Sequence, residues 1–150
     1  MPMLTLNRHI NAPPERVFAL TTDVEAFPKV VPGIKKTELL TPGPVGRGTR
    51  FRETREMFGK EATETMEFVE FSPPTGYTIG CTSCGVEYRT SFDLRAAPAG
   101  GTDLVMTMDC RPVTLFAKVV SPVMGLMMKG TMRKLLEADL DAVKRAAETA

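Results

Sequence analysis

The sequence predicts an α+β protein in which a curved antiparallel sheet of seven strands wraps around one long C-terminal helix. Alternating apolar and polar residues through the middle of the chain indicate strands of a sheet that is wet on one face only. The last part of the chain, Leu115–Thr149, repeats apolar residues at the three-and-four spacing of an amphipathic helix. This helix is the only predicted element large enough to cover the apolar face of the sheet. Because a sheet and a helix curve differently, we expect a cavity between them.

Length and composition predict a single soluble domain over residues 1–150. The 150 residues are 43% hydrophobic and 25% charged, and 19 Lys plus Arg against 18 Asp plus Glu leave a net charge of +1. This balance provides no general attraction to nucleic acid or to an anionic membrane. The opening MPMLTLNRHI lacks the basic and apolar regions of a secretory signal, and no apolar run is long enough for a membrane span. We therefore expect a cytoplasmic protein.

The N-terminal region predicts one strand followed by two short helices. Met3–Ile10 alternates weakly and is expected to form the first strand. Asn11 offers a capping side chain, prolines follow in the first turn, and Glu15 adds an early acid, which is the order of a helix start. Val24–Val30 predicts a second short helix, which Pro28 should cut. Both helices should precede the second strand.

Six further strands are predicted from period-two patterns between turns rich in glycine and proline. They cover Ile34–Leu40, Thr49–Phe58, Glu61–Phe71, Tyr77–Cys84, Val86–Arg95 and Leu104–Cys110. The clearest alternation places an inner row at Val86, Tyr88, Thr90, Phe92 and Leu94. In the strand before Ser72, Val69 and Phe71 compete for the inside with the even-numbered apolar residues, which predicts a β-bulge. The short connections predict an antiparallel meander.

The apolar stripe of the C-terminal helix is rich in methionine. It consists of Met124, Met127, Met128, Met132, Leu135, Leu136, Leu140 and Val143, and the charged residues opposite it are Lys129, Arg133, Glu137, Asp141 and Lys144. Methionine is unbranched and polarizable, so it adapts to contents that vary and suits a cavity wall. The alternative is an ordinary packed core, which uses the same spacing. Pro122 predicts a kink or break near Ser121.

Several segments together resemble one known superfamily. They are INAPPERVFALTTDVEAFPKVVPG, the loop and strand VGRGTRFRETREMFG, the turn FSPPTGY, the hairpin exit GGTDLVMTM and the terminal SPVMGLMMKGTMRKLLEADLDAVK. With the order of elements, they resemble the polyketide cyclase/dehydratase-like branch of the START-related (SRPBCC) helix-grip superfamily. The resemblance covers nearly the whole chain. It implies a START-like helix-grip domain, in which the sheet grips the C-terminal helix around an apolar pocket.

The same resemblance implies much less about activity. The superfamily includes lipid carriers, hormone-binding proteins, aromatase/cyclases, coenzyme Q-binding proteins and chaperone activators, and a fold does not fix a function. It has no single shared catalytic motif, so the resemblance identifies no catalytic residue. Whether the chain is an enzyme stays open at this point.

Glu53 and Arg55 are the charged candidates for a ligand site. If Phe51 faces the cavity, strand alternation turns both of them inward with it. Burying such charges is costly unless they pair, so a retained pair would orient a polar ligand group. The alternative is a half-solvated pair near the sheet edge. Tyr88 adds a hydroxyl to the inner row, and either a ligand or the fold itself can satisfy it.

Other chemistries find little support in the residues. His9 is the only histidine and is expected at a surface or edge, so a histidine mechanism has no second candidate. Cys81 and Cys84 have the spacing of a redox pair but lie in a strand pattern, and we expect reduced thiols. We find no metal-ligand set or phosphate-binding loop and expect neither metal nor cofactor. The basic residues between 35 and 52 are expected on a solvated face, without a nucleic-acid partner.

The leading hypothesis is that the cavity binds a small hydrophobic molecule, such as a polyketide, an isoprenoid or a lipid. The residues predicted to bind it are Phe51, Glu53, Arg55, Met66, Phe68, Tyr88, Phe92, Met106, Met108, Met124, Met128 and Met132. One alternative is an enzyme of the polyketide cyclase/dehydratase kind, in which a polar side chain moves a proton. Another is a protein-interaction module, in which the Met-rich helix face accepts another protein or a second copy of this chain.

Overall fold

The computed structural model describes residues 4–57, 59–83 and 85–149, and the side chains of residues 57, 116, 117 and 120–128 lie outside the described part. The strands are β1 (Leu4–Ile10), β2 (Ile34–Leu39), β3 (Arg50–Met57), β4 (Lys60–Ser72), β5 (Gly76–Ser83), β6 (Val86–Ala96) and β7 (Thr102–Pro112). The helices are α1 (Pro14–Thr22), the 3₁₀ turn η1 (Val24–Ala26), α2 (Phe27–Val30) and α3 (Leu115–Thr149). The predicted α+β class and order of elements are confirmed.

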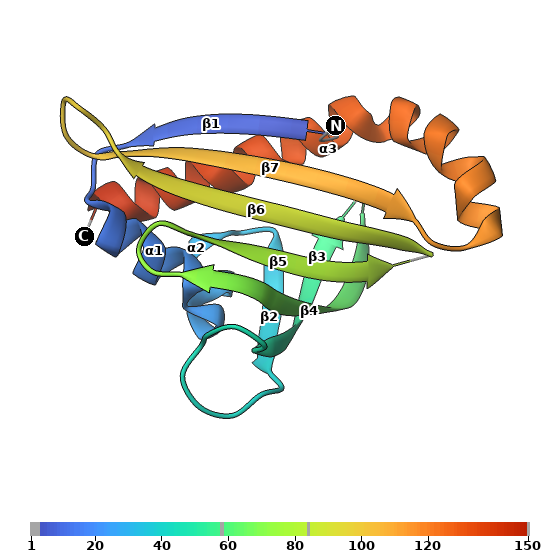
Figure 1. The fold of residues 1–150 in the computed structure, drawn as a ribbon, viewed down its shortest axis with the longest axis horizontal. Helices are drawn as coiled ribbons and strands as arrows, with labels where there is room; N and C mark the ends of the chain where they lie inside the picture. The colour runs from blue at the N-terminus through green and yellow to red at the C-terminus, as the bar shows by residue number, and fades with distance from the viewer. Residues whose placement is uncertain (1–3, 58, 84, 150) are drawn as a thin grey trace.

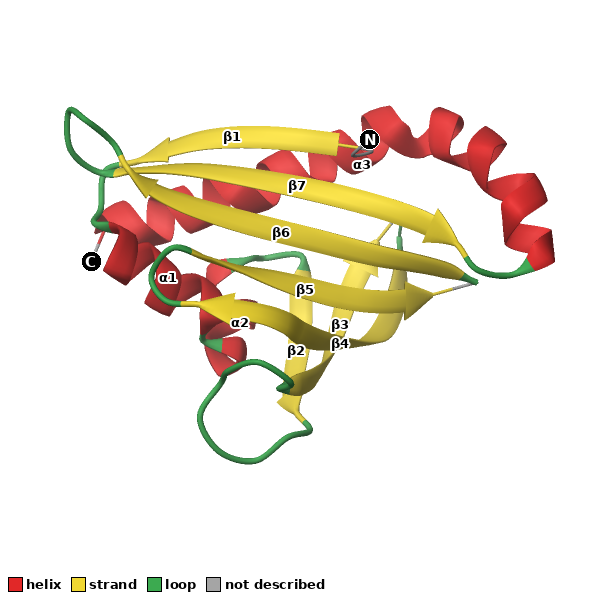
Figure 2. Cartoon of the chain, viewed as in Figure 1, coloured by secondary structure: helices red, strands yellow, loops and turns green. Residues whose placement is uncertain are grey.

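All seven strands form one antiparallel sheet in the order β1-β7-β6-β5-β4-β3-β2. The sheet is a meander from β2 to β7, and β1 adds to its far edge beside β7. Figure 1 shows that the sheet curls, so that β2 and β3 run across the direction of β1 and β7. The helix α3 lies along one face of this curl and contacts β1, β7, α1 and α2 (Figure 2). The sheet therefore wraps around the C-terminal half of α3.

Proline lies in the first turn of both α1 and α2. The helix α1 begins at Pro14 with Pro13 at the N-cap position, and no side chain caps it. The predicted Asn11 cap is wrong, because the Asn11 side-chain oxygen lies 3.0 Å from Nε2 of His9 instead. The segment predicted as a helix over Val24–Val30 is divided next to Pro28, into η1 and α2. Pro28 lies in the first turn of α2, where its missing N–H has no intrahelical partner to lose.

The bulge predicted in the fourth strand is confirmed. The register between β4 and β5 shifts between Phe68 and Glu70. After the shift both Phe68 and Phe71 lie in the core, with ring centroids 5.7 Å apart. Val69 packs outside them against Gly80, where a Cβ would lie 3.2 Å from the valine methyl group. The bulge thus adds a second aromatic ring to the inner face of β4.

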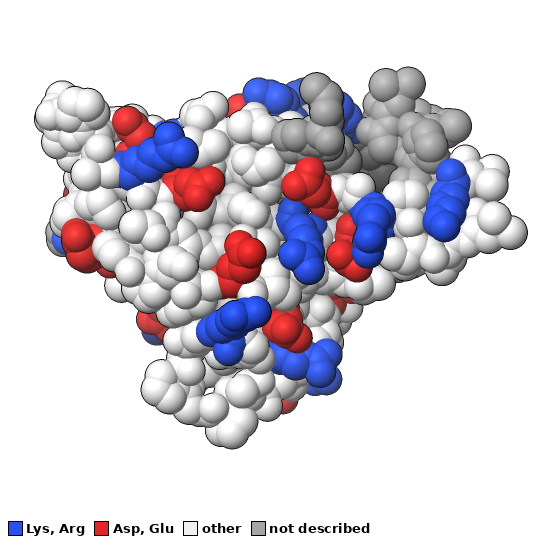
Figure 3. Space-filling view, in the orientation of Figure 1, with Lys and Arg blue, Asp and Glu red and all other residues white. Residues whose placement is uncertain are grey.

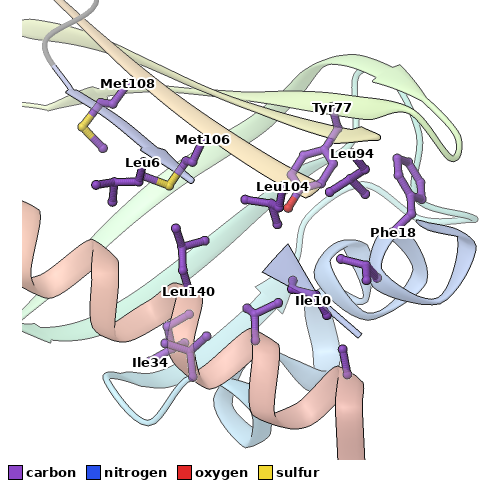
Figure 4. Packing of buried hydrophobic residues seen from close by; sticks show 14 of the residues in the cluster. Leu6, Ile10, Phe18, Ile34, Tyr77, Leu94, Leu104, Met106, Met108 and Leu140 are labelled. Carbon is purple, nitrogen blue, oxygen red and sulfur yellow. The ribbon is translucent and has the colours of Figure 1, made fainter. Parts of the chain in front are cut away.

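Among the described side chains of α3, those that pack in the core come from its C-terminal half. Leu140 is 2% exposed, and Figure 4 shows it pointing toward Leu6 and Met106 on the sheet. The sequence predicts a kink or a break near Pro122, and the helix is not broken there. Figure 1 shows that the N-terminal half of the α3 ribbon is bent. Among the described residues, no helix is long and apolar enough to cross a membrane.

Candidate functional site

A cavity of about 280 Å³ lies between α3, the inner face of the sheet and the short helices. The sheet contributes Ile34, Glu53, Arg55, Ala62, Glu64, Met66, Tyr77, Ile79, Thr90, Phe92, Leu104, Met106 and Met108. The helical regions contribute Leu20, Thr21, Phe27, Val30, Val31, Met132, Leu135, Leu136, Asp139, Leu140 and Val143. The volume is close to the lower end of ligand pockets, about 300 Å³. The cavity therefore has room for one small molecule.

The wall from α3 follows the spacing expected of one helix face. Met132, Leu136 and Val143 lie three or four residues from their neighbours in the wall, so one stripe of the helix faces the cavity. Asp139 lies within that stripe, between Leu136 and Leu140. An acid inside an apolar stripe needs a partner, because an unpaired buried charge is strongly unfavourable.

Arg55 is that partner and joins two carboxylates. Its Nη1 donates to Oδ2 of Asp139 at 2.8 Å, and its Nε lies 3.7 Å from Oε2 of Glu53. The side chains of Glu53, Arg55 and Asp139 are 10%, 14% and 18% exposed, respectively. Glu53 and Arg55 therefore face the cavity as the inward alternative requires, and they are not a half-solvated edge pair. We call Glu53, Arg55 and Asp139 the charged triad.

Burial and Arg55 act in opposite directions on the pKa values of the two acids. Burial raises the pKa of Glu53, Arg55 counteracts this rise, and the nearby Asp139 adds to it. Burial likewise raises the pKa of Asp139, again against the effect of Arg55. Each carboxyl is therefore easier to protonate than an exposed one.

A third carboxylate, Glu64, stands directly across from Glu53 in the pairing of β3 with β4. Ser83 donates a hydrogen bond from its hydroxyl to Oε1 of Glu64 at 2.8 Å, and Sγ of Cys81 lies 4.0 Å from Oε2. Like charges directly opposite on neighbouring strands repel each other. Glu53 and Glu64 therefore form a polar region of a mainly apolar lining.

Tyr77 brings a hydroxyl to the cavity, but the fold satisfies it. The ring is 5% exposed, and the hydroxyl forms a hydrogen bond with Thr21. Burial raises the pKa of Tyr77 despite this hydrogen bond. Thr21 in turn donates to the carbonyl oxygen of Val17 at 2.8 Å. This pair connects α1 to the sheet and closes one part of the wall.

The structure gathers seven of the predicted ligand-binding residues around the cavity. These are Glu53, Arg55, Met66, Phe92, Met106, Met108 and Met132. Phe51 and Phe68 are both 0% exposed and pack in the core as a tilted ring pair with centroids 5.5 Å apart, and neither lines the cavity. Tyr88 is half-buried on β6 outside the lining. The side chains of Met124 and Met128 lie outside the described part.

Sequence reasoning missed Asp139, Glu64 and most of the wall formed by the short helices. A signal for Asp139 was present, because it falls on the apolar face of α3 and not among the charged residues opposite. Glu64 shares the parity of Met66 on β4, which places it on the inner face. The contributions of α1 and α2 depend on how these helices dock, and no periodicity encodes that.

No thiol or imidazole group is among the residues that line the described cavity, although Cys81 lies beside Glu64. His9 is exposed, as predicted, and its Nδ1 lies 2.9 Å from Oδ1 of Asp103. Cys81 and Cys110 lie on strands β5 and β7, whereas Cys84 lies outside the described residues. Burial raises the pKa of Cys81 to about 11, the opposite of what a redox thiol needs. Among the described residues no group of His, Cys, Asp and Glu could hold a metal ion.

The outer surface is charged in both signs. Figure 3 shows acidic and basic side chains interspersed over the face that carries the outer side of the sheet. Lys35 lies 3.1 Å from Glu56, and Arg52 lies 3.1 Å from Glu38, so these basic residues form solvated pairs as expected. At the start of α3, Leu115 is 80% exposed. Most side chains of that segment lie outside the described part, so the protein-interaction alternative stays a prediction.

Comparisons with known proteins place the chain in a wider context. The family of polyketide cyclase / dehydrase and lipid transport proteins matches residues 1–148. No curated protein shows significant similarity. A START superfamily protein from Mycobacterium smegmatis aligns with a TM-score of 0.79 and 20% identity, over 97% of this chain and 96% of that chain.

Two further solved structures are similar. Protein TTHA0849 from Thermus thermophilus aligns with a TM-score of 0.69 and 21% identity, over 96% of this chain and 98% of its own. The di-domain ARO/CYC BexL from the BE-7585A biosynthetic pathway aligns with a TM-score of 0.77 and 18% identity. That match covers 98% of this chain and 50% of BexL. At these identities the likeness shows a common fold.

Proposed function

The chain belongs to the polyketide cyclase / dehydrase and lipid transport family, and from this premise we propose that its cavity binds one small, mostly apolar molecule. The observation that carries the proposal is the cavity itself, about 280 Å³ with a mainly apolar lining and few charged groups. In such a pocket, buried apolar area supplies the affinity and a few polar groups fix the orientation.

The apolar wall favours a ligand whose shape varies. Met66, Met106 and Met108 come from the sheet and Met132 from α3, so methionine lines the cavity from both sides. Three rotatable bonds let each of these side chains follow a different ligand outline at little cost. This composition supports a polyketide, an isoprenoid or a lipid-like molecule better than a rigid polar metabolite.

Filling the cavity tests the proposal. Thr90 lines the cavity on β6, paired with Ile79 and Met108, so Thr90→Phe adds a ring to the ligand space. We expect the affinity for the neutral fluorescent probe N-phenyl-1-naphthylamine to fall by at least about 10-fold, which corresponds to about 1.4 kcal/mol. Thr82→Phe, at an exposed position of β5, is the matched control and should bind the probe as the wild type does. Equal binding by Thr90→Phe would refute the proposed site.

A second candidate function is catalysis of cyclisation or dehydration, and the charged triad is the observation that favours it. Aldol ring closure removes a proton from the carbon beside one carbonyl and adds a proton to the oxygen of another, and dehydration then releases water. Glu53 and Asp139 each line the cavity with a raised pKa, so one can hold a proton while the other accepts one. The guanidinium of Arg55 contacts both acids and so holds them close to each other.

An isosteric substitution separates catalysis from binding. With a linear poly-β-ketone thioester as substrate, Glu53→Gln should lower kcat by about 10²–10⁴-fold while the probe still binds. The control is Glu67→Gln on the same strand pair, whose side chain is 43% exposed. Unchanged turnover in Glu53→Gln would remove Glu53 from the reaction, and no turnover by the wild type would leave binding alone as the function.

A further inference from the structure

The charged groups that line the cavity are unequal in sign. Three carboxylates, Glu53, Glu64 and Asp139, and one guanidinium, Arg55, are the ionisable acids and bases of the described lining apart from the phenol of Tyr77. The acids of the described lining therefore outnumber its bases by three to one.

The single cation of the described lining is already engaged. Arg55 donates to Asp139 at 2.8 Å and lies 3.7 Å from Glu53, so both neighbours on its guanidinium are carboxylates of the protein itself. A ligand carboxylate entering the cavity would have to displace one of these partners or remain unpaired. Either outcome costs free energy, because an unpaired charge in a mostly apolar site is poorly solvated.

Two hydroxyl groups of the lining, those of Thr21 and Tyr77, are used within the fold, whereas Glu64 keeps acceptor capacity. The hydroxyl of Thr21 donates to Val17, and Tyr77 hydrogen-bonds with Thr21. Glu64 receives one hydrogen bond from Ser83 at 2.8 Å, and a carboxylate has about four acceptor sites. A ligand that carries a hydrogen-bond donor can therefore use the carboxylate acceptors of the lining.

From this arrangement we infer that the cavity selects apolar molecules whose polar group donates hydrogen bonds, a hydroxyl or a protonated amine, and discriminates against carboxylates such as fatty acids. The inference rests on the proposed function, because it names the ligand class of the same cavity. Glu53, Glu64 and Asp139 are the residues that confer this selectivity.

Three ligands with one apolar body test the inference. Isothermal titration calorimetry at about pH 7.5 compares 2-naphthylmethanol, 2-naphthylmethylamine and 2-naphthylacetate, which differ in the polar group. We expect the alcohol or the amine to bind at least about 10-fold more tightly than the acetate. In Glu53→Gln/Glu64→Gln the acetate should gain affinity relative to the amine, whereas the exposed control Glu67→Gln should keep the wild-type ratio.

The outcomes separate the inference from the proposed function. If N-phenyl-1-naphthylamine binds but the acetate binds as well as the other two, or none of the three binds, the ligand class is wrong and the cavity remains a binding site. A wild-type preference that the double variant leaves unchanged also overturns the inference, because the carboxylates then do not cause it. If the neutral probe fails to bind as well, the proposed function itself fails.

Discussion

Replacing Arg55 by methionine removes the one cation from the charged triad and leaves two acids on the cavity wall. The substitution keeps a long flexible side chain, so the loss of charge dominates over the loss of volume. The matched control is Arg52→Met on the same strand, where Arg52 points to the outer face and lies 3.1 Å from Glu38. The side chains of this control pair are 46% and 50% exposed.

The expected cost follows from the geometry of the triad. At an effective dielectric constant of about 20, Coulomb's law assigns about 6 kcal/mol to the Arg55 and Asp139 contact at 2.8 Å and about 4.5 kcal/mol to the Arg55 and Glu53 contact at 3.7 Å. Desolvation offsets most of this attraction. Removing one partner of a buried pair costs about 3–5 kcal/mol, whereas an exposed pair contributes at most about 1 kcal/mol.

The cost should depend on pH with a defined sign. The pKa values of Glu53 and Asp139 are raised in the folded protein, so the folded state holds protons that the unfolded state releases. The stability that this provides is full below the unfolded pKa values and is lost as pH rises through the folded ones. Because Arg55 opposes the rise, Arg55→Met should lose stability more steeply with pH than the wild type does.

Urea denaturation at about pH 5 and about pH 8 measures both effects. Far-ultraviolet circular dichroism is the suitable signal because the chain has no tryptophan. We expect a deficit of about 3–5 kcal/mol for Arg55→Met near pH 8 and a smaller deficit near pH 5. The reasoning is refuted if Arg55→Met costs no more than Arg52→Met, or if its deficit is the same at both pH values.

Three further predictions follow from single residues. Hydrogen bonding to Asp103 raises the pKa of His9 above 6.5, so an NMR titration should show the rise and Asp103→Asn should reduce it; a wild-type value at or below 6.5 would contradict this. Burial raises the pKa of Cys81 to about 11. In a variant whose other cysteines are replaced by serine, Cys81 should therefore react with iodoacetamide at about pH 8 roughly 100-fold more slowly than a free thiol. A rate like that of free cysteine would show that Cys81 is not buried. Leu140→Ala should lower the free energy of unfolding by about 2–5 kcal/mol and Leu115→Ala by less than about 0.5 kcal/mol, and equal losses would argue against the packing of α3.

Helices and strands whose buried residues recur at a regular spacing could be predicted from the sequence. The three-and-four spacing around Leu136 and Leu140 correctly indicated the face of α3 that meets the sheet. The competition between Phe68 and Val69 correctly indicated the bulge in β4. In both cases neighbouring residues carry the information, because each apolar residue must reach the same core.

Depth within the inner face could not be predicted in this way. Phe51 and Glu53 share one parity on β3, yet Phe51 packs between aromatic rings while Glu53 lines the cavity. Alternation states which side of the sheet a residue faces and says nothing about what fills the space above it. Phe27 of α2 packs its ring 5.8 Å from that of Phe51, and this docking decides that the position belongs to the core.

Two of the three residues of the charged triad could be predicted from the sequence. Glu53 and Arg55 could be identified because they are two residues apart on one strand. The shortest contact of Arg55 is with Asp139, 84 residues away along the chain. Such a pairing depends on how α3 crosses the sheet. An acid inside an apolar helix stripe signals that some partner must exist, without identifying which one.

The most direct test of the central claim is native mass spectrometry of the protein isolated from the organism that encodes it, alongside Thr90→Phe prepared in the same way. We predict that the wild type carries a small molecule that is released on unfolding and that extraction recovers a mostly apolar compound with a hydroxyl or amine group. The variant with the filled cavity should lack this mass. The same adduct on both proteins, or on neither, would contradict a ligand held between the sheet and α3.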